Sequence, residues 1–151
     1  MNNKPENITV RVYGILINNK NEILLSDEFA LGQKLTKFPG GGLELGEGTR
    51  ETLIREFEEE FNQEIYVKEH FYTTDYFQNA YGLDKYQLLS IYYFVELKGE
   101  NKLKISKKPF DKLDFKPGDQ TIRFENINNL TENDISFPID KTVLQKLKNT
   151  L

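Results

Sequence analysis

Residues 40 to 63 read GGGLELGEGTRETLIREFEEEFNQ, and this stretch decides how the rest of the chain is interpreted. Three glycines lead into a short acidic loop, and the six positions from Arg55 to Glu60 then hold one arginine and four glutamates. Like charges one helical turn apart repel each other. A helix built from this stretch therefore requires a positive partner for its carboxylates.

An apolar stripe indicates that the second half of the stretch is a helix packed on a core. The stripe recurs every fourth residue and consists of Leu53, Phe57 and Phe61, with Ile54 beside it. Thr49 is the expected N-cap of this helix, and Glu51 lies in the first turn, where a carboxylate suits the helix dipole. We therefore predict a loop followed by an amphipathic helix.

Three glutamates share a face of this helix away from the stripe, because Glu56, Glu59 and Glu60 stand at i, i+3 and i+4. Arg55 is one counter-charge for them, and a divalent cation, which prefers oxygen ligands, is the other. Charged helix faces are often only solvated surface. The glycines ahead of the helix favour a ligand site, because glycine lets the backbone approach a ligand closely.

The spacing of the glycine, the arginine and the glutamates in this stretch resembles the pattern of a known family. Gly41, five residues, Glu47, seven residues and then the run from Arg55 to Glu60 resemble the signature box of the Nudix hydrolases. The stretch departs from the box at its end, where Asn62 replaces a glycine and Gln63 an apolar residue. Asparagine also adopts the left-handed conformation that ends a helix, and Ile65 is expected to supply the packing that Gln63 lacks.

The resemblance implies an enzyme that hydrolyses a pyrophosphate linkage in a nucleoside diphosphate derivative, with Mg²⁺ or Mn²⁺ as cofactor. It assigns Glu59 and Glu60 as the principal metal ligands. Glu56 is implied to be a further ligand or the general base, and the main-chain carbonyl of Gly41 or a neighbour is implied to complete the metal site.

Two further roles follow from the same resemblance. Arg55 is implied to orient the glutamates, and Glu47 to brace Arg55. The family commonly takes an additional acid from a loop before the last strand, which makes Asp119 the candidate here and Glu125 the second choice. An acid in a charged loop is also often only solvated.

Substrate contacts are expected outside the box. Phe137 and Asp140 resemble the segment that lies against the base in relatives that remove oxidised guanine nucleotides, although Phe137 also suits a role in seating the last helix. Tyr76 and Phe77 lie in a loop whose rings suit stacking on a nucleobase or ordinary packing. These features favour a nucleoside triphosphate as substrate, and a nucleotide-binding or regulatory domain without turnover is the alternative.

Composition limits the remaining classes of function. The 151 residues suit a single domain, 1–151. The net charge of −4 gives no electrostatic reason to expect nucleic-acid or membrane binding. There is no cysteine, residues 1–10 contain no apolar run of the kind found in a secretory leader, and no span of about twenty apolar residues is present. We therefore expect a cytoplasmic protein that acts on a small molecule and that forms either a monomer or a homodimer.

The fold class predicted from the chain is α/β (α+β). Strands are expected at 8–17, 23–25, 65–74, 86–97 and 121–124, with a hairpin turn at 18–21. Loops are expected at 32–37 and, long and flexible, at 98–120, and a C-terminal helix at 143–147. The only histidine, His70, is expected to be structural. The Nudix resemblance implies an α/β/α sandwich with a central mixed sheet and the box as loop-helix-loop.

Overall fold

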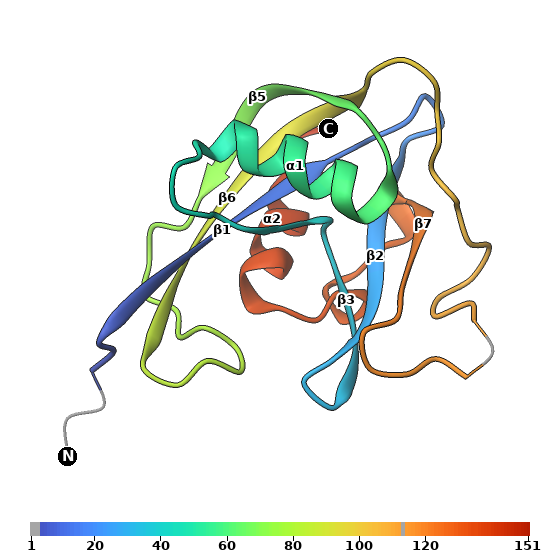
Figure 1. Ribbon diagram of the computed structural model, residues 1–151. Helices are drawn as coiled ribbons and strands as arrows, with labels where there is room; N and C mark the ends of the chain where they lie inside the picture. The colour runs from blue at the N-terminus through green and yellow to red at the C-terminus, as the bar shows by residue number, and fades with distance from the viewer. Residues whose placement is uncertain (1–3, 113) are drawn as a thin grey trace. The chain divides into compact units, whose positions relative to one another are not determined.

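A computed structural model describes residues 4–112 and 114–151 of the chain (Figure 1). The chain divides into two compact units. The first comprises Met1–Gly14 and Gly40–Asn101, and the second Ile15–Pro39 and Lys102–Leu151. Residues 40 to 63 therefore lie entirely in the first unit.

A four-stranded sheet forms the base of the first unit, with the strand order β4-β1-β6-β5. Its strands are β1 (Asn7–Ile15), β4 (Gly40–Gly42), β5 (Ile65–Thr73) and β6 (Tyr86–Leu97). β4 pairs antiparallel with β1, which places Gly41 opposite Val12, and β5 pairs antiparallel with β6. The strands predicted at 8–17, 65–74 and 86–97 are thus confirmed.

Helix α1 (Thr49–Phe61) lies along this sheet and contacts β4 and β5 (Figure 1). Leu53 and Phe57 are completely buried, and a Cβ on Gly14 of β1 would come within 3.0 Å of the Phe57 ring. The predicted apolar stripe therefore anchors the helix. Ile54 is 42% exposed and does not belong to the buried stripe.

The N-terminus of α1 differs from the prediction by one residue, because the N-cap is Gly48 and Thr49 is already helical. The amide of Gly48 donates to the carboxylate of Glu51 at 3.2 Å. The Thr49 hydroxyl is 2.7 Å from the Tyr93 hydroxyl of β6. Thr49 therefore ties the helix to the sheet instead of capping the helix.

The C-terminus of α1 explains both departures from the signature box. Asn62 adopts the left-handed conformation with φ 52°, as predicted for the residue that replaces glycine. Gln63 is completely buried, and its Nε2 donates to the carbonyls of Glu64 at 2.8 Å and Glu100 at 3.2 Å. Ile65 is buried next to it. An amide whose hydrogen bonds are satisfied thus occupies the apolar position of the box.

The second unit contains a three-stranded antiparallel sheet with the order β3-β2-β7. Its strands are β2 (Glu22–Ala30), β3 (Gln33–Lys37) and β7 (Gln120–Asn126). Two short 3-10 helices follow, η1 (Ile127–Asn129) and η2 (Glu132–Asp134), and then helix α2 (Pro138–Thr150). The strand predicted at 121–124 and the C-terminal helix are confirmed, and both are longer than predicted.

Two local predictions were wrong. Residues 32–37 were expected to be a loop, but 33–37 form strand β3, and the turn before it uses positive φ at Leu31 and Gly32. The expected hairpin between 8–17 and 23–25 is only a short contact. It is formed by the hydrogen bond from the Leu24 amide to the Leu16 carbonyl and by the antiparallel bridge between Ile17 and Ile23. The long strands of that hairpin belong to different sheets.

The α+β class is confirmed, with two helices and the strands distributed over two sheets. Residues 98–119 contain no regular strand or helix in their described part, which agrees with the predicted loop. Among the described residues, none of the helices has the length and apolar character needed to cross a membrane.

Candidate functional site

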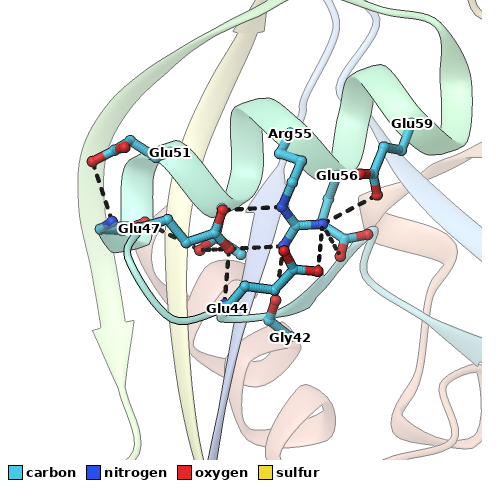
Figure 2. A network of polar contacts seen from close by, with 9 residues as sticks. Gly42, Glu44, Glu47, Glu51, Arg55, Glu56 and Glu59 are labelled. Carbon is cyan, nitrogen blue, oxygen red and sulfur yellow. Dashed lines mark hydrogen bonds and ion pairs between the residues drawn. The ribbon is translucent and has the colours of Figure 1, made fainter.

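Arg55 lies at the centre of the candidate site, where its guanidinium pairs with four carboxylates, those of Glu44, Glu47, Glu56 and Glu59 (Figure 2). Its Nε and Nη2 donate to the two oxygens of Glu47 at 3.0 and 2.7 Å, a bidentate pair. Its Nη1 is 3.1 Å from both the Glu56 Oε1 and the Glu59 Oε2. The predicted bond between Glu47 and Arg55 is therefore present, and Arg55 also links two predicted metal ligands.

Glu47 is held from several directions in the loop before α1. Its Oε1 accepts from the Glu44 amide at 2.9 Å and from the Thr52 hydroxyl at 2.8 Å, besides the Arg55 guanidinium. The Arg55 hydrogen bond is the main cause that lowers the pKa of Glu47 to about 2, with the bonds from Glu44 and Thr52 adding to it and partial burial opposing it. Glu47 is thus a fixed anion that holds Arg55 in place.

We expect a Glu47→Gln variant to lose the acid-sensitive part of the stability of this loop. The pKa of Glu47 is depressed in the folded protein, so its contribution is complete above about pH 4.5 and disappears as the pH falls toward 2. Chemical unfolding in metal-free buffer at pH 7 and near pH 2.5 measures this difference. The difference in the free energy of unfolding between wild type and Glu47→Gln should shrink at low pH. The variant Glu58→Gln, at an exposed position on α1, should show no such pH-dependent difference from wild type. A gap of equal size at both pH values would contradict the assignment.

Gly41 and Glu56 fit closely together. A Cβ on Gly41 would lie 2.2 Å from both the Cδ and the Oε1 of Glu56, so only glycine leaves room for this carboxylate. The carbonyl of the next residue, Gly42, accepts from Arg55 Nη2 at 2.9 Å. Strand β4 therefore leaves room for the Glu56 carboxylate at Gly41, which lacks a Cβ, and it binds Arg55 through the main-chain carbonyl of Gly42.

The side chains at this site carry the type of oxygen donor that a hard divalent cation prefers, but they are not gathered into a metal-binding group. In the described parts of the chain, 4–112 and 114–151, no three or more His, Asp or Glu side chains are grouped so that they could hold a metal ion. Instead, the Nη1 of Arg55 stands as a positive group at 3.1 Å from both Glu56 and Glu59. Two carboxylates therefore already converge on one positively charged atom, and these contacts use one oxygen of each. Carboxylate oxygens are the ligands that Mg²⁺ and Mn²⁺ prefer.

The remaining glutamates of the box are more open. Glu59 and Glu60 are exposed on α1, whereas Glu56 is half-buried. The structure thus brings together Gly41, Glu47, Arg55, Glu56 and Glu59, and it leaves Glu60 at the solvent-facing side of the helix. The role of Glu60 as a metal ligand stays a prediction.

The predicted additional acids belong to the second unit. The Asp119 carboxylate accepts hydrogen bonds from the Lys112 ammonium at 2.8 Å and from the Lys116 amide at 2.9 Å. The hydrogen bond from Lys112 is the main cause that lowers the pKa of Asp119. Glu125 accepts from Arg123 at 2.6 Å. Both acids are therefore held by a basic partner, and their part in catalysis stays a prediction.

The four predicted substrate contacts divide between the units. Tyr76 and Phe77 belong to the first unit, where both rings are exposed in the loop after β5. Phe137 precedes α2 in the second unit, and Asp140 is buried in the first turn of that helix. Exposed rings are available for stacking, so Tyr76 and Phe77 keep this role as a prediction.

His70 makes local contacts within the first unit. Its Nε2 is 2.7 Å from the Thr73 hydroxyl, and its ring packs edge-to-face on Tyr93. These contacts agree with the expected structural role.

Two residues of the network were missed in the sequence. Glu44 lies 3.7 Å from Arg55 Nη1 and is largely exposed, and its amide binds Glu47. Thr52 is completely buried and bonds Glu47. The signal for Thr52 was its spacing, because it precedes Arg55 by three residues and therefore lies on the same side of the helix.

Comparison with known proteins gives a family match over most of the chain. The model of the NUDIX domain family matches residues 7–133, which include parts of both units. No curated protein matches the chain in sequence.

Solved structures share the fold at low sequence identity. The E. coli ORF135 protein is 18% identical with a TM-score of 0.69, covering 95% of this chain and 90% of its own. A MutT protein from Methanosarcina mazei Go1 is 15% identical with a TM-score of 0.66 over the full length of both chains. A UDP-X diphosphatase is 17% identical with a TM-score of 0.61, covering 93% of this chain and 63% of its own.

Proposed function

Because the chain belongs to the Nudix family, whose members hydrolyse a pyrophosphate linkage in nucleoside diphosphate derivatives, we propose that it cleaves nucleoside triphosphates with Mg²⁺ or Mn²⁺ as cofactor. The observation that supports this most directly is the Arg55 network. It holds Glu56 and Glu59 around one positive atom, next to Gly41, where a Cβ would lie 2.2 Å from the Glu56 carboxylate.

We assign the metal to Glu56, Glu59 and Glu60, with the carbonyl of Gly41 as a further donor. When bound, Mg²⁺ or Mn²⁺ supplies the positive charge that offsets the repulsion between phosphate oxygens and attacking water. Arg55 aligns the glutamates, and Glu47 keeps Arg55 in place through its bidentate bond.

In the proposed reaction, a water oxygen attacks one phosphorus of the pyrophosphate linkage, and the bond from this phosphorus to the bridging oxygen breaks. A general base takes the proton of the attacking water. Glu56 is our first candidate for this base, because Gly41 and Arg55 hold its carboxylate in a defined position. Asp119 is the second candidate.

The choice of a nucleoside triphosphate rests on residues outside the box. The exposed rings of Tyr76 and Phe77 are suited to stacking on a base. Phe137 and Asp140 lie at the start of α2, in the segment whose sequence resembles the one that lies against the base in relatives that remove oxidised guanine nucleotides. The similar solved structures include both a MutT protein and a UDP-X diphosphatase. A free nucleotide in the cytoplasm, standard or oxidised, is therefore the substrate class we propose.

The test is hydrolysis of a panel of nucleoside triphosphates, oxidised nucleotides and nucleotide sugars, with and without Mg²⁺. We expect metal-dependent release of phosphate or pyrophosphate, fastest with a triphosphate, and a loss of about a hundredfold or more in Glu59→Gln and Glu60→Gln. Glu58→Gln, which changes an exposed glutamate between the ligands, is the matched control. If nucleotides bind and none is cleaved, the chain is a nucleotide-binding domain without turnover.

A further inference from the structure

Residues 102 to 116, between β6 and β7, form a basic segment in an acidic protein (gold to orange in Figure 1). We call it the lysine segment. It has six lysines and two aspartates, a net charge of +4, whereas the whole chain has a net charge of −4. The six lysines are all exposed, at positions 102, 104, 107, 108, 112 and 116. The Arg55 network lies in the other unit and does not use them.

The backbone of the lysine segment is fixed to the sheet of the second unit. Ile105 forms a parallel bridge with Ile122 of β7, and the Ser106 amide donates to the Ile122 carbonyl at 2.7 Å. Farther along, the Phe110 amide donates to the buried carboxylate of Asp27 on β2 at 3.3 Å. In the part that the structure describes, 102–112 and 114–116, the segment contains no helix or regular strand. It is anchored at two points, and the lysines between these anchors are displayed from a defined backbone.

The acidic side chains near the segment neutralise only part of its charge. Asp119 binds Lys112 at 2.8 Å, and Asp111 approaches Lys108 only to 4.0 Å while the Lys108 side chain stays 75% exposed. Lys104 and Lys107 are exposed as well. These ammonium groups repel one another, and an exposed cluster of this kind attracts anions.

The spacing of three of these lysines matches a short phosphate chain. Lys104, Lys107 and Lys108 span five positions, so their Cα atoms lie within about 14 Å of each other. Their flexible side chains can converge on one ligand inside that span. A lysine ammonium binds phosphate as a compact point charge, and a ligand with several adjacent phosphates offers one to each lysine.

The aromatic residues of the segment argue against single-stranded nucleic acid as the ligand. Binding of that kind combines a basic surface with aromatic rings on which bases stack. Here the Phe110 and Phe115 rings pack on each other edge-to-face at 5.3 Å, and the Lys34 ammonium lies over the Phe110 ring. These two rings are occupied within their own unit, and the lysines remain as the recognition groups.

We propose that the lysine segment is a second anion site that binds short polyphosphate chains, either inorganic or attached to a nucleoside, through Lys104, Lys107 and Lys108. This binding requires neither a divalent metal nor the glutamates of α1. It therefore goes beyond the hydrolytic function proposed above and does not depend on it.

Calorimetric titration with inorganic tripolyphosphate, in buffer freed of divalent metal over a chelating resin, tests the proposal. We expect saturable binding that weakens as salt rises from 50 to 200 mM, and a loss of about tenfold or more in K104Q/K107Q/K108Q. The matched control removes three exposed lysines elsewhere, K20Q/K68Q/K85Q, and should bind within about twofold of wild type. Circular dichroism and the unfolding midpoint verify that both triple variants are folded.

Three further binding measurements distinguish a site on the lysine segment from a site at the metal box and from nucleic-acid binding. ATP should bind as tightly as tripolyphosphate and lose affinity in the same variant, because the phosphates alone are recognised. Glu59→Gln and Glu60→Gln should retain tripolyphosphate binding, and its loss there would place the anion at the metal box and overturn the proposal. Absence of saturable binding, an equal loss in both triple variants, or tighter binding of an unphosphorylated RNA oligonucleotide would also overturn it.

Discussion

A Gly41→Ala substitution should abolish most of the hydrolytic activity while the protein stays folded. The added Cβ would lie 2.2 Å from the Cδ and Oε1 of Glu56, far inside contact distance. The atoms it meets are the end of a flexible side chain, so the carboxylate can swing away without unfolding α1. A displacement of about 1 Å at a catalytic group can reduce the rate a hundredfold, and we expect a loss of about this size or greater in kcat/KM.

The neighbouring glycine provides a matched control. A Cβ on Gly42 would meet only the Arg11 guanidinium at 3.8 Å, an ordinary contact, and the Gly42 carbonyl would still accept from Arg55. Gly42→Ala should therefore retain activity within about an order of magnitude of wild type. The measurements are kcat/KM, the unfolding midpoint and calorimetric Mg²⁺ affinity, which should also fall in Gly41→Ala. Equal activity in the two variants would show that Glu56 does not need this position.

The signature stretch was predictable because its information is local. The apolar residues Leu53 and Phe57 repeat with the helical period and are buried as predicted, and Glu47 lies at a fixed distance along the chain from Arg55. A bidentate bond between them requires only that the loop folds back on the first turns of the helix. Local patterns of this kind do not depend on how the strands of the sheet pair.

The failed predictions depend on contacts between distant residues. Residues 33–37 are mostly polar and follow a glycine, which is typical of a loop, yet they pair with β2 along five residues. The turn at 18–21 suggested a long hairpin, but β1 and β2 find their partners in different sheets. Strand pairing is decided by which edges meet in three dimensions, and turn residues alone do not reveal this.

The buried ion pair between Asp27 and Arg123 was also invisible in the sequence. Asp27 of β2 is completely buried, and its two carboxylate oxygens accept from Arg123 Nε and Nη2 of β7 at 2.7 and 3.3 Å. The Thr36 hydroxyl of β3 donates to it at 2.7 Å. Burial opposes the charge of Arg123, but its bonds to Asp27 and Glu125 outweigh this and raise its pKa. One carboxylate therefore joins all three strands of the sheet.

We expect Asp27→Asn to lower the free energy of unfolding by about 3 to 5 kcal/mol, because it leaves the Arg123 charge in a buried position without its main partner. Glu96→Gln makes the same chemical change at the exposed Lys68–Glu96 pair, whose atoms are 3.8 Å apart, and should cost less than about 1 kcal/mol. Urea unfolding at pH 7 measures both values. Because the cost in Asp27→Asn arises from the stranded charge, adding Arg123→Met to it should recover part of the stability. If the double variant is instead less stable than Asp27→Asn alone, the strands are held by Arg123 through other contacts, and the carboxylate is not the group that joins them.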